Sequence, residues 1–157
     1  MKEIKELPAG KKRLLPPAYL FIGILITGVL FFVLPVKNIV PFPWNLIGTL
    51  PLLFGIIINL RADKLFKDNN TTVKPLQPSA VLITSGVFRI TRNPMYLGFV
   101  CILLGIAVIT GCLSVFSVPI VFAFMVDRLF ICPEEQMLEK QFGNDWHDYK
   151  KKTRRWI

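Results

Sequence analysis

Two short polar stretches at the ends of apolar runs contain the residue types that could do chemistry. In the first stretch, ITRNPMYLGF, Arg92 and Asn93 precede a proline that leads into an apolar run. In the second stretch, ICPEEQML, Glu134 and Glu135 follow the end of a different apolar run. Guanidinium groups and the free N–H groups of a helix start suit a carboxylate or phosphate. Carboxylates suit an amine, a sulfonium ion or ribose hydroxyls. Together the stretches could hold one ligand that carries both signs of charge.

Each stretch also has a purely structural explanation, which the pattern alone favours. Asn93 suits a helix N-cap and Pro94 suits the first helical turn, where its missing N–H costs nothing. Tyr96 suits the aromatic belt at a membrane surface. Glu134 and Glu135 suit the first turn of a following helix, where negative charge complements the helix dipole.

Four apolar runs position these stretches, and each is close to the ~20 residues that span a bilayer core. The runs cover residues 17–36, 44–60, 95–110 and 112–131. Gly111 separates the last two, which predicts a tight helical hairpin. The first run is too long for a signal peptide and lacks a cleavage site, so we expect a retained span. The chain of 157 residues is therefore predicted to be a single all-α integral membrane domain with four transmembrane helices.

The distribution of positive charge predicts the topology. Residues 1–16 carry five Lys or Arg, residues 61–94 carry six and residues 127–157 carry seven, which leaves Lys37 between the first two runs. With four spans, 18 of the 19 positive charges lie on one side. The positive-inside rule then places both termini, the loop 61–94 and the tail 133–157 in the cytoplasm.

Composition narrows the classes of partner. Apolar residues make up 53% of the chain and the mean hydropathy is +0.53, yet the formal net charge is +9. A chain this apolar and this basic suits a bilayer with anionic lipids; it does not suit nucleic acid, because no basic stripe interleaves with exposed aromatic residues. Three scattered cysteines and one histidine, His147, predict neither a metal site nor a disulfide framework.

The tail predicts an amphipathic helix on the membrane surface, interrupted near Gly143. Leu138, Phe142 and Tyr149 form its apolar stripe, with Met137 and Trp146 beside it. The basic ending YKKKTRRWI would hold this helix against anionic headgroups.

Two smaller patterns leave alternatives open. Gly48 and Gly55 are seven residues apart, as are Gly98 and Gly105, which predicts close helix packing, room for a flat ligand edge, or both. Asp127 and the adjacent Arg128 either pair at the membrane surface or line a cavity.

Three segments resemble the membrane methyltransferases, namely the isoprenylcysteine carboxyl methyltransferases, the phospholipid N-methyltransferases and their small bacterial relatives. The segments are TTVKP, LITSGVFRITRNPMYLG and PEEQMLEKQFGNDWHDYKKKTRRW, and the resemblance covers roughly residues 45–157. It implies binding of S-adenosylmethionine at the cytoplasmic ends of the last helices. The residues it implies for cofactor binding are Arg89, Arg92, Asn93, Pro94, Tyr96, Gly98, Glu134 and Glu135, with weaker similarity at Gly55 and Gly86, and the catalytic candidates are Arg92 and Glu135.

Departures from the isoprenylcysteine type make a prenylated protein substrate doubtful. Ala80 and Asn93 stand where that type has histidine, and VFR replaces its Pro-Tyr-Arg turn. The leading hypothesis is an S-adenosylmethionine-dependent methyltransferase of a bacterial or archaeal inner membrane. Its acceptor is a lipid or another membrane-dissolved small molecule, with the reacting atom open among carboxyl, amine and thiol. The alternatives are an NADPH-dependent membrane reductase and a non-catalytic accessory protein with the same fold.

Overall fold

The computed structural model describes residues 14–71 and 81–157, and within these ranges the regular structure is helical. The only β pairing among these residues is an isolated bridge between Asn38 and Cys112. The basic segment 1–13, most of the TTVKP motif and Ala80 lie outside the described residues.

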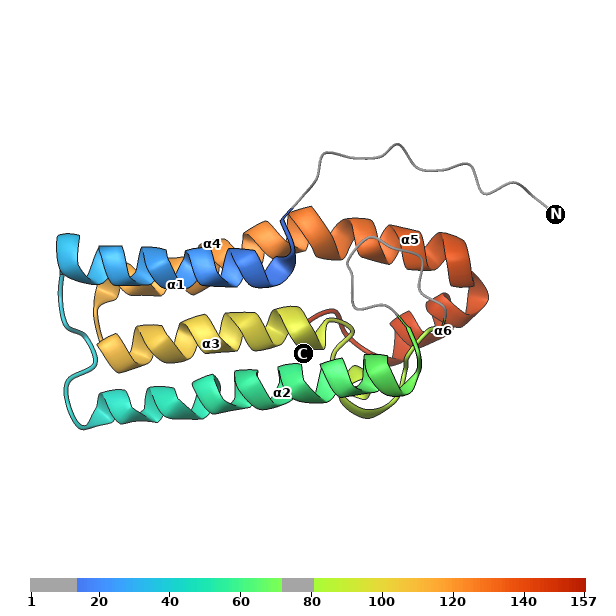
Figure 1. Cartoon of the computed structure of the whole chain (residues 1–157), viewed down its shortest axis with the longest axis horizontal. Helices are drawn as coiled ribbons and strands as arrows, with labels where there is room; N and C mark the ends of the chain where they lie inside the picture. The colour runs from blue at the N-terminus through green and yellow to red at the C-terminus, as the bar shows by residue number, and fades with distance from the viewer. Residues whose placement is uncertain (1–13, 72–80) are drawn as a thin grey trace.

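The first four helices run in alternating directions along one bundle (Figure 1). The α-helices are α1 (Pro16–Val33), α2 (Thr49–Asp68), α3 (Pro94–Thr110), α4 (Ser117–Val126), α5 (Cys132–Phe142) and α6 (Asn144–Lys152). A 3-10 turn precedes each of α2, α3 and α4, at Trp44–Gly48, Gly86–Arg89 and Leu113–Phe116. A π-helical turn, Asp127–Ile131, joins α4 to α5.

Three helical segments are long and apolar enough to cross a membrane, and α3 is a shorter apolar helix. The three are Pro16–Val33, Trp44–Asp68 and Leu113–Phe142. The 17 residues of α3 measure about 26 Å, slightly less than a ~30 Å hydrocarbon core. Because α3 contacts α1, α2 and α4, it lies inside the bundle. These helices match the four predicted runs; the membrane sidedness stays a prediction.

The seven-spaced glycines bring the backbones of α2 and α3 together. A Cβ on Gly55 would lie 2.5 Å from the carbonyl oxygen of Gly98, and one on Gly48 would lie 2.6 Å from that of Gly105. Such distances leave no room for a side chain, so the glycines are needed for packing. This confirms the packing interpretation of the two pairs.

The predicted hairpin turn at Gly111 is confirmed. Gly111 ends α3 with φ +66°, a left-handed conformation that glycine adopts without strain. The linker between α1 and α2 pairs with this turn, because the amide of Ile39 donates to the Gly111 carbonyl (2.8 Å) and that of Leu113 donates to the Lys37 carbonyl (2.9 Å).

Two helices continue beyond the boundaries that hydropathy predicts. α2 continues past Leu60 to Asp68, because Ala62 and Leu65 pack into a core cluster that the tail completes. The last apolar run continues through the π-helical turn into α5 as one helix, Leu113–Phe142. Glu134 and Glu135 lie in the first turn of α5, as predicted, but α5 continues directly from the π-helical turn, so their charge does not face a free helix start.

The tail breaks at Gly143, where φ is +51°, as the sequence predicted. Its apolar side does not face the membrane. Trp146, only 1% exposed, and Tyr149 pack instead against Ile58, Ala62 and neighbouring residues of one core cluster. The protein itself covers this face, because two large aromatic rings gain more from a shaped core than from a bilayer surface.

Candidate functional site

The loop before α3 is held by the last residues of the chain. The amide of Arg92 donates to the carbonyl of Arg154 (3.0 Å). The hydroxyl of Thr91 and the side-chain amide of Asn93 both donate to the carbonyl of Arg155, at 3.0 and 3.1 Å. Asn93 precedes α3 as predicted, but its side chain makes no capping hydrogen bond, so that part of the prediction is wrong. The side-chain amide of Asn93 instead binds the backbone of Arg155.

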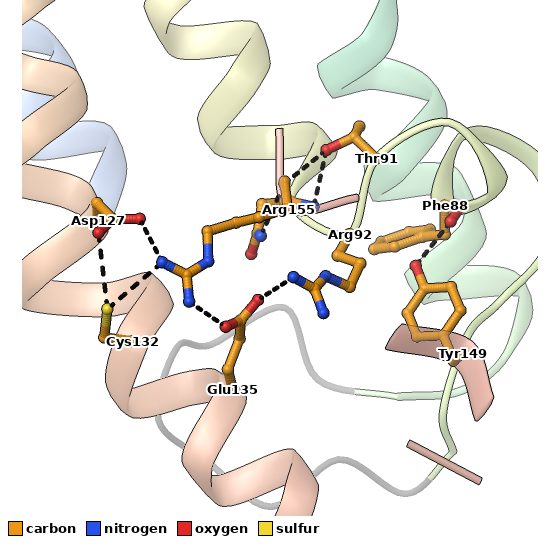
Figure 2. Close-up of polar contacts among 9 residues, drawn as sticks. Phe88, Thr91, Arg92, Asp127, Cys132, Glu135, Tyr149 and Arg155 are labelled. Carbon is orange, nitrogen blue, oxygen red and sulfur yellow. Dashed lines mark hydrogen bonds and ion pairs between the residues drawn. The ribbon is translucent and has the colours of Figure 1, made fainter. Parts of the chain in front are cut away.

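Arg92 and Glu135 form a buried ion pair at the centre of the site (Figure 2). Arg92 Nη2 lies 3.1 Å from Glu135 Oε1, and the two side chains are 8% and 9% exposed. The guanidinium also lies over the Trp146 ring, 5.6 Å from its centroid. Burial of this kind is costly unless both charges are paired, so the pair fixes where α3 and α5 sit relative to each other.

Arg155 connects the same glutamate to the π-helical turn (Figure 2). Its Nη2 donates to Glu135 Oε2 at 2.6 Å and its Nη1 to Asp127 Oδ1 at 3.2 Å. The hydrogen bond to Glu135 raises the pKa of the Arg155 guanidinium above its usual value. Asp127 therefore pairs with Arg155, whereas Arg128 is exposed, so the predicted pairing of these two neighbours is wrong.

Glu134 has a different environment from Glu135. Its Oε1 accepts a hydrogen bond of 2.8 Å from the hydroxyl of Tyr96, whose ring stacks on Phe130 with centroids 5.9 Å apart. No cation pairs with Glu134 among the described residues. Adjacent acids thus have different partners: two guanidinium groups pair with Glu135, whereas Glu134 accepts a hydrogen bond from the Tyr96 hydroxyl.

Tyr149 closes the side of the site opposite α5. Its hydroxyl donates to the carbonyl of Phe88 at 2.6 Å, and the residue is buried. Burial raises the pKa of Tyr149 against the opposing effect of the nearby Arg92 charge. The phenol therefore stays protonated and keeps the loop before α3 in place.

These groups surround a cavity of about 110 Å³. Its walls are Phe66, Val81, Leu82, Ile83, Phe88, Arg92, Asn93, Glu134, Glu135, Leu138, Trp146 and Tyr149. Pockets that enclose a small ligand measure about 300–1,000 Å³, so a nucleoside-sized ligand would extend beyond these walls.

Unused hydrogen-bond donors in the wall fit an anionic ligand. Arg92 Nε, Arg92 Nη1 and Trp146 Nε1 are buried and have no hydrogen-bond partner among residues 14–71 and 81–157. Buried donors of this kind are rare unless a ligand or water satisfies them. With Glu134 on the same wall, the donor set fits a zwitterion that carries a carboxylate and a cationic group, as S-adenosylmethionine does.

Four of the residues predicted for cofactor binding line the cavity: Arg92, Asn93, Glu134 and Glu135. The others lie elsewhere. Tyr96 bonds to Glu134 from behind the wall, and Pro94 is buried at the start of α3. Gly55 and Gly98 lie in the contact between α2 and α3. Gly86 lies beside Leu65 in a turn, where its φ is +58°. Arg89 is exposed.

Sequence reasoning missed four residues that build the site: Asp127 as a partner of Arg155, Arg155 itself, Trp146 and Tyr149. The signal for the two aromatic residues was present, because they belong to the predicted apolar stripe of the tail. Arg155 lies in a run of basic residues that we assigned to lipid headgroups, and it contacts internal carboxylates instead.

Comparisons with known proteins bear on the family and the fold of the chain. The family model for phospholipid methyltransferase matches residues 44–145. An uncharacterized protein of Haemophilus influenzae is 35% identical over 63 residues, which are 40% of this chain and the whole of that protein.

Among solved structures, that of a eukaryotic intramembrane Ras methyltransferase, isoprenylcysteine carboxyl methyltransferase, matches with a TM-score of 0.67 and 23% sequence identity. The match covers 90% of this chain and 52% of that one, so this chain spans about half the length of that protein. At this identity the likeness shows a shared membrane fold.

Proposed function

This integral membrane chain belongs to the phospholipid methyltransferase family, and on that premise we propose that it transfers a methyl group from S-adenosylmethionine to a lipidic acceptor. The observation that carries the proposal is the buried Arg92–Glu135 pair, whose arginine has two unused donors in the wall of a cavity. We further propose that the cavity faces the cytoplasm of a bacterial or archaeal cell, since the described basic residues at the end of α2, before α3 and in α6 lie at this end of the bundle (Figure 1).

Each polar residue of the cavity has a distinct part in this proposal. Arg92 offers Nε and Nη1 to the carboxylate of the cofactor, while the ion pair with Glu135 fixes the orientation of the guanidinium. Glu134, which has no cationic partner among the described residues, accepts the ammonium group or the ribose hydroxyls. Asn93 helps to fix the position of the neighbouring Arg92, because its side-chain amide donates to the carbonyl of Arg155. Trp146 Nε1 supplies one further donor.

S-adenosylmethionine supplies a methyl group that is already activated by its sulfonium ion. The protein then has to hold the donor and the acceptor in line and keep water away, and it needs no metal or covalent intermediate for this. Phe88, Trp146 and Leu138 give the cavity apolar walls beside the charged groups. An acceptor dissolved in the membrane and a cofactor dissolved in water would meet here, at the end of α3.

Titration calorimetry on the purified protein in detergent tests the proposal. We expect S-adenosylmethionine and its demethylated product to bind, and Arg92→Lys to weaken binding about tenfold or more, because a lysine loses the planar pair of donors. Arg89→Lys is the matched control, since Arg89 is exposed in the same loop and should leave affinity unchanged.

The same experiment separates the alternatives. Binding of NADPH in place of S-adenosylmethionine would support a reductase. A folded protein that binds neither molecule, in detergent or in lipid, would contradict the methyltransferase proposal and favour the accessory protein.

A further inference from the structure

A second cavity, of about 180 Å³, lies as a groove between α1 and α4. Its lining is almost entirely apolar: Tyr19, Ile22, Gly23, Ile26 and Leu30 from α1, and Ser117, Val118, Val121, Phe122 and Met125 from α4. The rim residues Ile22, Ile26 and Val121 are 42%, 47% and 64% exposed. Because both helices belong to candidate membrane spans, the groove opens toward lipid.

The floor of the groove depends on Gly23, which is buried. A Cβ at this position would lie 3.3 Å from both methyl groups of Leu103 and 3.8 Å from the Phe122 ring. Glycine here lets α1 approach α3 while a hollow stays open beside α4. A larger residue would have to move Leu103 or fill the groove.

One end of the groove adjoins the candidate site through a row of aromatic rings. Tyr19 packs edge-on against Phe130 with centroids 5.5 Å apart, and Phe130 stacks on Tyr96 at 5.9 Å. Tyr96 in turn donates its hydroxyl to Glu134, which lines the first cavity. The groove therefore begins at the same level along the bundle as the site.

The length of the groove corresponds to one leaflet of a bilayer. Eleven residues separate Tyr19 from Leu30, which is about 16 Å along a helix axis. Half of a ~30 Å hydrocarbon core is about 15 Å. A chain that starts at the level of the site and follows the groove would end near the middle of the membrane, as a lipid tail does.

From these observations we propose that the groove between α1 and α4 holds a hydrocarbon chain of the methyl acceptor, with the polar head of the acceptor at the Glu134 side of the aromatic row. This inference rests on the proposed function. It assigns the acceptor to lipids with a chain long enough to fill one leaflet. It also assigns α1 and α4 to substrate recognition and leaves the loop before α3, α5 and α6 to hold the cofactor.

Photo-cross-linking tests the occupant directly. The full chain is reconstituted in vesicles of phosphatidylethanolamine and phosphatidylglycerol that contain a phosphatidylethanolamine with a diazirine on one acyl chain. We expect labelled peptides from both sides of the groove, at Ile22, Ile26, Val121 and Met125. The exposed residues Leu25 and Phe124, which lie on the same helices outside the groove, serve as the measure of ordinary lipid contact.

Rim substitutions fill the groove without disturbing the core. Val121→Trp and, separately, Ile26→Trp should each lower groove labelling severalfold, because the indole ring fills the hollow and removes the van der Waals contacts that would hold a chain there. Phe124→Trp and Leu25→Trp are the matched controls and should leave labelling unchanged. All four positions are exposed, so the fold should tolerate a tryptophan there.

The outcome separates this inference from the proposed function. Calorimetry with S-adenosylmethionine should give the same affinity for Val121→Trp and the unchanged protein, since the groove lies outside the first cavity. Equal labelling of groove and control positions would overturn the groove inference while cofactor binding still stood. Loss of cofactor binding in the unchanged protein would overturn the proposed function instead.

Discussion

The two ends of the helical bundle are held together by different means. At the end with the α3–α4 turn, backbone hydrogen bonds join the linker before α2 to Gly111 and Leu113. At the other end, charged side chains from the loop before α3, the π-helical turn, α5 and the chain terminus pair in the interior. Backbone pairing closes a turn with little need for particular side chains. Buried charges are an expensive way to join helices, so their concentration at one end points to function there.

Glu135→Gln should have the largest effect at the charged end. The neutral amide leaves Arg92 buried without its counter-charge and weakens the bond to Arg155, which should cost about 3 kcal/mol of unfolding free energy. Unfolding in mixed micelles and calorimetry with S-adenosylmethionine measure the two consequences, and we expect cofactor binding to be lost as well. Glu139→Gln is the control, because the side chain of that acid is 41% exposed and its ion pair among the described residues is with His147. Equal effects of the two substitutions would remove the distinction between buried and surface charge.

Gly111→Ala tests the opposite end. A Cβ would lie 2.5 Å from the Val40 carbonyl, and alanine disfavours the left-handed backbone, so stability should fall by about 2 kcal/mol. The affinity for S-adenosylmethionine should not change. A large loss of affinity in a folded variant would show that the two ends are coupled, contrary to the comparison.

Arg155→Gln should cost about 1 to 2 kcal/mol of unfolding free energy, less than Glu135→Gln. Its side chain is 36% exposed, so water screens part of its interaction with Asp127 and Glu135. Cofactor affinity should fall moderately because Glu135 loses one of its two anchors. Arg154→Gln in the adjacent position is the control, since that residue is exposed and contacts the site through its backbone. A variant as stable as the control would mean that Arg155 does not hold the terminus.

Tyr149→Phe should have the smallest effect, about 1 kcal/mol, from the lost hydrogen bond to the Phe88 carbonyl. Burial raises the pKa of Tyr149, so in the folded state this phenol resists ionisation. Its contribution is present in full below the unfolded value of about 10 and is lost as the pH rises above it. Melting temperatures measured between pH 8 and about 11 should therefore fall less steeply for the phenylalanine variant. Parallel curves would contradict the assignment.

Local patterns predicted the parts of this molecule that depend on local physics. The apolar runs gave the helices, Gly111 gave the turn, the seven-spaced glycines gave the α2–α3 contact, and Gly143 gave the break in the tail. Each of these follows from hydropathy or backbone conformation within a few residues. The boundaries at Leu60 and at residue 131 were less accurate, since tertiary packing extends α2 and a π-helical turn continues the last span.

The site required information that no local pattern contains. Arg92, Glu135 and Arg155 meet only after the bundle folds, and a basic residue near the terminus looks the same whether it contacts a lipid or a buried carboxylate. The family resemblance brought together the first two, which lie in motifs. Arg155 and Asp127 were missed as a pair because the basic ending that contains Arg155 was assigned to lipid headgroups, whereas Asp127 was considered only with its neighbour Arg128.

Transfer of a radioactive methyl group from labelled S-adenosylmethionine into the lipid extract of reconstituted membranes tests the central claim most directly. Three proteins are compared: the unchanged chain, Glu135→Gln and the control Glu139→Gln. We predict labelled lipid with the unchanged chain and with the control, and none above background with Glu135→Gln. Absence of labelled lipid with all three proteins while each remains folded, or equal labelling by all three, would contradict a methyltransferase site built on Arg92 and Glu135.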